Sequence, residues 1–108
     1  MISRTELMEL ALRAGFQCYE PATAAKNYIA ELADRLESTR FYDLKFRDAL
    51  MEIGVGNIRD GGVGTLVRKE EKIASALRSG QLSADENYAL CMSIFDAASQ
   101  ADSEDLMG

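Results

Sequence analysis

The 108-residue sequence contains no histidine and no tryptophan, and it has only two cysteines and one proline. Without histidine, the Ser–His and Cys–His pairs of common hydrolases cannot form. Zinc sites need sets of Cys and His ligands, whereas Cys18 and Cys91 stand far apart in the chain. We therefore expect no enzymatic activity, no metal ion and no cofactor, and we interpret both cysteines as reduced, buried side chains.

Long apolar runs are also absent, because charged residues interrupt every hydrophobic stretch. A membrane-spanning helix needs roughly 20 apolar residues, so no membrane association is expected. The first residues lack the basic stretch and apolar run of a secretory signal, which predicts a cytoplasmic location. Hydrophobic residues make up 47% of the chain and charged residues 28%, as is typical of a folded globular protein.

Positive charge is missing from the last part of the chain. The formal net charge is −6, and residues 81–108 contain no lysine or arginine. Nucleic-acid binding relies on cations that neutralise phosphates, so direct binding to DNA or RNA is not expected. An acidic surface instead attracts a protein with a basic surface. The predicted partner-binding residues are the acidic ones of this segment: Asp85, Glu86, Asp96, Asp102, Glu104 and Asp105.

Glycine is concentrated in the middle of the chain, where five of the eight glycines lie in residues 54–64. This glycine-rich loop predicts a connection between two helical halves, 1–53 and 65–98. Glycines also let backbone amides approach a phosphate, which makes a nucleotide or phosphate site the alternative interpretation. The Walker pattern is incomplete because Gly62 replaces its lysine. The alternative anion-binding residues are Arg59, Gly61, Gly62, Gly64, Thr65, Arg68 and Lys69.

Apolar residues recur at helical spacing before the glycine-rich loop. Ser3 to Glu6 matches a capping box, which predicts a helix from Arg4 to Ala14 that ends with Gly15 as a left-handed cap. Pro21 suits the first turn of a second helix. The apolar face then changes direction, and this change predicts a break from Glu37 to Arg40.

Two further helices are predicted after the loop. The first begins near Gly64 or Thr65 and ends at Gly80. A second capping box, Ser83 to Glu86, predicts a helix from Ala84 to Ala98. Because this last helix is apolar on two faces, it is either central in the core or forms a homodimer through residues 84–98.

Aromatic residues gather at the predicted break, where Phe41 and Tyr42 follow Arg40. Aromatic and arginine side chains dominate the energetic centres of protein interfaces, so these residues form either a contact patch or part of the core. Core packing is the favoured interpretation for Phe41.

The predicted fold is therefore all-α, a single-domain bundle of four or five short helices over residues 1–100 with a Gly-rich central loop. Residues 101–108 are polar and acidic without periodicity, which predicts a flexible tail. In size, acidity and helix content, the chain resembles the small accessory proteins with which bacteriophages inhibit host machinery, anti-CRISPR proteins among them. This likeness of composition implies a non-enzymatic protein-binding inhibitor of nucleic-acid-handling machinery. The alternatives are a nucleotide-binding protein and a self-associating scaffold.

Overall fold

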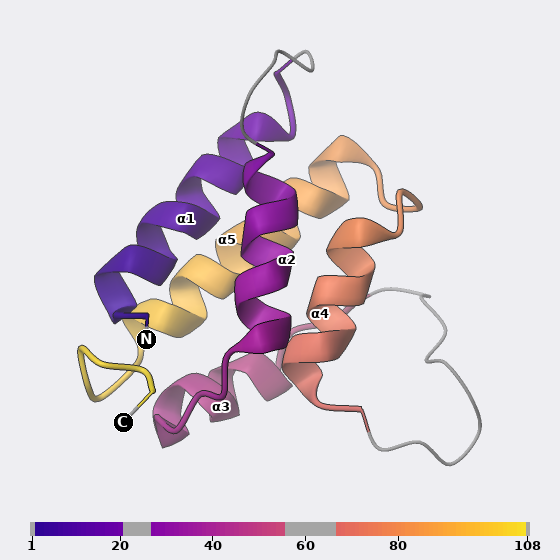
Figure 1. Cartoon of the computed structure of the whole chain (residues 1–108). Coiled ribbons are helices and arrows are strands. Elements are labelled where there is room, and N and C mark those ends of the chain that lie inside the picture. Colours follow the sequence, from indigo (N-terminus) through magenta and orange to yellow (C-terminus); the bar gives the residue numbers. More distant parts are fainter. Residues whose placement is uncertain (1, 21–26, 56–66, 108) are drawn as a thin grey trace.

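The computed structural model describes residues 2–20, 27–55 and 67–107 (Figure 1). Within these ranges there is no strand, only an isolated bridge between Ser3 and Asp105. The Cα radius of gyration is 13.2 Å, close to the value of about 13 Å for a folded chain of this size. The all-α fold predicted from the sequence is confirmed. The helices are α1 (Arg4–Gln17), α2 (Tyr28–Ser38), α3 (Leu44–Met51), α4 (Lys69–Arg78) and α5 (Ala84–Ser99).

The last helix, α5, is the centre of the bundle and packs against α1, α3 and α4 (Figure 1). Its predicted capping box is present: Ser83 Oγ accepts from the Glu86 amide at 3.1 Å, and Glu86 Oε1 accepts from the Ser83 amide at 3.0 Å. Helix α5 buries residues from both of its apolar faces, in agreement with the core interpretation, whereas self-association through residues 84–98 stays a prediction. The buried residues of α5 are Leu90, Cys91, Ile94, Ala97 and Ala98.

The first helix does not end at Gly15, and the prediction of a left-handed cap there is wrong. Helix α1 continues to Gln17, and Gly15 is buried within it. A Cβ atom at Gly15 would lie 2.6 Å from Cε of Met92 and 3.5 Å from Cβ of Cys91. The glycine therefore allows a close approach of α1 to α5, a tertiary role that the pattern of one helix does not reveal.

Helices α2 and α4 begin later than predicted. Asn27 caps α2 by accepting a hydrogen bond from a backbone amide one turn further on, at 3.1 Å, so α2 begins at Tyr28. Pro21, which was predicted in the first turn, lies outside the described residues. Helix α4 begins at Lys69 after the extended residue Arg68. The predicted start at residue 64 or 65 also lies outside the described ranges.

Two predicted helix ends are confirmed. The break expected from Glu37 to Arg40 is present, since α2 ends at Ser38 and Asp43 caps the start of α3. Gly80 adopts a φ of +70°, the left-handed conformation that follows the end of α4. Among the described helices, none is both long enough and apolar enough to cross a bilayer.

Residues 101–107 pack on the helices, so the prediction of a flexible tail is wrong for this segment. Leu106 is fully buried, and its carbonyl oxygen accepts from the Tyr42 amide at 2.8 Å. The Arg4 amide donates to the Glu104 carbonyl oxygen at 2.6 Å, and the two side chains form an ion pair at 3.2 Å. The C-terminal segment therefore joins the start of α1 to the start of α3, and Ser3 and Asp105 lie side by side in an isolated bridge.

Candidate functional site

The connector between α2 and α3 is anchored by one aromatic residue and exposes the next. Phe41 is buried, and its ring meets the Phe46 ring edge-on with centroids 4.8 Å apart. Successive side chains of an extended segment point in opposite directions. Tyr42 accordingly faces outward and is 58% exposed. Of the two aromatic residues at the predicted break, Phe41 belongs to the core and Tyr42 is available at the surface.

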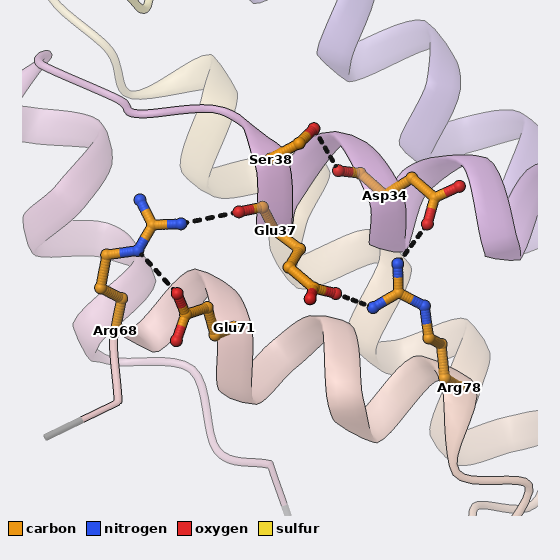
Figure 2. A network of polar contacts seen from close by, with 6 residues as sticks. All are labelled: Asp34, Glu37, Ser38, Arg68, Glu71 and Arg78. Carbon is orange, nitrogen blue, oxygen red and sulfur yellow. Dashed lines mark hydrogen bonds and ion pairs between the residues drawn. The ribbon is translucent and has the colours of Figure 1, made fainter. Parts of the chain in front are cut away.

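Two arginines of the α4 segment bind it to α2 (Figure 2). Arg68 donates to the carbonyl oxygen of Glu37 at 2.7 Å, and its Nε pairs with the Glu71 carboxylate at 3.2 Å. At the other end of α4, Arg78 pairs with the carboxylates of both Asp34 and Glu37. These contacts hold the start of α4 beside the α2–α3 connector.

Helix α3 carries large apolar side chains on both of its faces. The inner face buries Phe46 and Leu50. On the outer face, Leu44 is 70% exposed and Met51 is 66% exposed. Seven residues, or about two helical turns, separate Leu44 from Met51, so both side chains lie on the same side of the helix. Exposed apolar residues that gather in this way mark an interaction surface more often than an ordinary solvated face.

The connector, the outer face of α3 and the start of α4 border an open groove of about 660 Å³, which we call the α3 groove. The described residues include five large hydrophobic side chains that are exposed, and three of them line this groove: Tyr42, Leu44 and Met51. The other two, Phe16 and Tyr19, lie at the C-terminal end of α1. The α3 groove is therefore the main concentration of exposed apolar surface within the described ranges.

The charged residues that line the α3 groove are Arg40, Arg47, Arg68, Lys69, Asp48 and Glu70. Their formal net charge is +2, although the whole chain carries −6. Arg68 is already paired inside the chain, and Glu70 is buried. Arg40 and Arg47 are exposed and face solvent. The groove is thus a local region of positive charge on an acidic protein.

The predicted anion site is described only in part. Arg68 donates its hydrogen bonds to groups within the chain, and Lys69 borders the α3 groove. The site as a whole stays a prediction. The other predicted members lie outside the described residues: Arg59, Gly61, Gly62, Gly64 and Thr65.

The six predicted acidic partner-binding residues do not form one surface. Asp85 and Glu86 begin α5, whereas Asp102, Glu104 and Asp105 follow its end. Because α5 has 16 residues, the two groups are separated by a helix about 24 Å long. The structure therefore divides the predicted acidic surface between opposite ends of the bundle.

Several of these acidic side chains also have partners inside the chain. Hydrogen bonds from the Thr5 hydroxyl and amide lower the pKa of Glu104. Asp85 accepts from the hydroxyl of Tyr19, and this hydrogen bond raises the pKa of Tyr19 to about 12. Asp105 accepts from a neighbouring backbone amide at 3.1 Å, whereas Asp96 and Asp102 are exposed.

The two cysteines, distant in sequence, meet between α1 and α5. The Cys18 thiol donates to the Ala14 carbonyl oxygen at 3.3 Å, and the Cys91 thiol forms a hydrogen bond with Cys18. Burial raises the pKa of both thiols, that of Cys91 to about 12. Neither forms a disulfide; Cys91 is buried as predicted, whereas Cys18 is only partly buried.

We expect both thiols of the folded protein to react slowly with iodoacetamide near neutral pH, because a raised pKa leaves little reactive thiolate. Unfolding in urea should restore fast labelling, which mass spectrometry of the intact chain measures.

The Cys91 pKa is 9.0 in the unfolded chain and about 12 in the fold. Between these values only the unfolded state loses the proton, so stability should fall as pH rises above 9. Rapid labelling of native Cys91 would contradict this expectation, and a Cys91→Ala variant should show a smaller loss at high pH.

Comparison with known proteins adds no assignment, since no family model, curated protein or solved structure matches this chain. Within the described ranges, no three His, Cys, Asp or Glu residues come together as a set of metal ligands. The α3 groove is therefore the candidate site that the described residues define.

Proposed function

We propose that this chain is a small non-enzymatic protein-binding module that docks its partner in the α3 groove. The supporting observation is the gathering of Tyr42, Leu44 and Met51 in one groove. Tyrosine, methionine and arginine are enriched at the centres of protein interfaces. The groove combines these residue types, with Arg40 and Arg47 beside the apolar side chains.

Contacts within the chain hold the walls of the α3 groove. Phe41 packs against Phe46 behind the connector, and Arg68 binds the start of α4 to the end of α2. A site that is formed before binding loses less conformational entropy when the partner arrives. This arrangement supports docking of a folded or folding segment without rearrangement of the bundle.

The predicted acidic binding residues have a secondary role in this proposal. They lie at the two ends of α5, and some of them stabilise the bundle, so we assign the main contact to the α3 groove. Exposed residues such as Asp96 and Asp102 contribute to the field that orients an approaching partner. A module of this kind acts as an inhibitor when it covers a functional surface of its partner, which is the role implied by the likeness to phage accessory proteins.

A paired-variant capture experiment tests the proposal. We expect the immobilised chain to capture a partner from a lysate of its source cell, and a Leu44→Ser/Met51→Ser variant to hold that partner at least about tenfold more weakly, since hot-spot residues each contribute more than 1 kcal/mol. Both side chains are exposed, so the variant should keep its circular dichroism spectrum and melting temperature.

The matched control is Phe16→Ser, which removes a hydrophobic side chain that is 56% exposed at the far end of α1. This control should retain the partner at the wild-type level. Equal retention by the wild type, the groove variant and the control would show that the partner docks elsewhere.

A further inference from the structure

The shape of the α3 groove fits a helix. It lies along the outer face of one helix and beside the first turn of another. Leu44 and Met51 are about 10 Å apart along the axis of α3. A partner helix laid along α3 would meet both with apolar side chains at positions i and i+7, while Tyr42 borders the groove before the start of α3. Strand addition requires an open sheet edge, which the described residues do not contain.

The charged residues around the apolar contacts determine which sign of charge the occupant of the groove should carry. Arg40 and Arg47 are exposed on the α3 side, and Lys69 lies on the α4 side. Among the lining residues, the opposing carboxylates are Asp48, which is exposed, and Glu70, which is buried in the first turn of α4. An occupant of the groove therefore meets three cations and one exposed carboxylate.

The charge of the rest of the protein strengthens the preference for an acidic occupant. Because the groove carries +2 and the chain −6, the other residues together carry −8. Acidic molecules are repelled by the net negative charge of the protein and attracted by the groove, so charge favours the approach of an acidic partner at the groove.

Building on the proposed function, we infer that the occupant of the α3 groove is an acidic amphipathic helix of a partner protein. Its apolar face contacts Leu44 and Met51, and its flanking Asp or Glu residues pair with Arg40 and Arg47. Nucleic acid fits the groove less well, because its binding requires many cations. The two exposed aliphatic side chains also find no complement on a phosphate backbone.

Selection from a surface-displayed library of helical peptides tests the occupant. The library is sorted for binding to the labelled full chain and depleted of peptides that bind the Leu44→Ser/Met51→Ser variant. We expect enriched peptides to combine apolar residues at helical spacing with flanking Asp and Glu. In fluorescence anisotropy, the best peptide should bind at least tenfold more tightly than its Lys-substituted counterpart, and rising salt should weaken binding.

Charge exchange on the protein provides the matched control. An Arg40→Glu/Arg47→Glu variant should prefer the Lys-substituted peptide, whereas Arg40→Lys/Arg47→Lys should keep the wild-type preference. All four substitutions are at exposed positions, so the fold is retained.

Four outcomes would overturn the inference in different ways. Enrichment of basic or uncharged peptides that still require Leu44 and Met51 contradicts the acidic occupant but leaves the proposed function intact. If no peptide depends on these two residues, both the inference and the groove assignment fail. Tighter binding of a single-stranded oligonucleotide than of the best peptide would assign the groove to nucleic acid. A dimer on a sizing column that the Leu44→Ser/Met51→Ser variant abolishes would assign the groove to a second copy of the chain.

Discussion

Replacing Leu106 by alanine is expected to lower the free energy of unfolding by about 2 to 5 kcal/mol, the range of large-to-small substitutions in a core. The reason is that Leu106 is completely buried although it lies only two residues from the end of the chain. Its side chain belongs to the same hydrophobic cluster as Ile2, Phe46 and Leu50. Truncation leaves a cavity where the C-terminal segment, the start of α1 and α3 meet.

Urea denaturation followed by far-UV circular dichroism measures this loss. The matched control is Asp102→Ala, which removes an exposed side chain from the same segment and should change stability by less than about 0.5 kcal/mol. Deletion of residues 102–108 should cost at least as much as Leu106→Ala, because it also removes the carbonyl oxygen that accepts from the Tyr42 amide. Equal stability of Leu106→Ala and Asp102→Ala would mean that the C-terminal segment does not contribute to the core.

The same residue shows where sequence reasoning succeeds and where it stops. Helix ends with a local chemical signal were predictable, as with the capping box at Ser83 and the left-handed Gly80. Leu106 is a single large apolar residue in a polar stretch, and periodicity needs several such residues to give a signal. Gly15 was misjudged for a related reason, because its place depends on α5, which is distant in sequence.

The candidate site was predictable only in part. The grouping of Phe41 and Tyr42 with Arg40 pointed to the connector, and the structure separates the buried ring from the exposed one. Leu44 and Met51 were missed, because only the change in direction of one apolar face was used in this region. Their seven-residue spacing, offset from Phe46, is a signal that could have indicated a second apolar face. The groove itself depends on how α4 packs beside α3, which no local pattern encodes.

Replacing Asp43 by alanine should lower the free energy of unfolding by about 2 to 4 kcal/mol, since it removes a helix cap and leaves a second amide without its acceptor. Asp43 is buried and uses both carboxylate oxygens. Oδ1 accepts from the Phe46 amide at 2.9 Å and caps α3, and Oδ2 accepts from the Ser103 amide at 2.8 Å. One side chain therefore starts α3 and anchors the C-terminal segment to it.

The dependence of this loss on pH identifies the carboxylate as its source. Burial by itself would raise the pKa of Asp43, but hydrogen bonds from backbone amides, above all that of Phe46, lower it below the ordinary value of 3.8. Because the pKa is lower in the folded state, the stabilisation is complete above pH 3.8 and is lost as pH falls through the folded-state pKa. The difference in unfolding free energy between wild type and Asp43→Ala should therefore be constant near neutral pH and shrink in acid. Asp43→Asn keeps a capping oxygen but turns an amide donor toward one of the backbone amides. The stability of this variant should therefore lie between those of the wild type and Asp43→Ala. A difference between wild type and Asp43→Ala that does not change in acid would show that the ionised carboxylate contributes nothing beyond its shape.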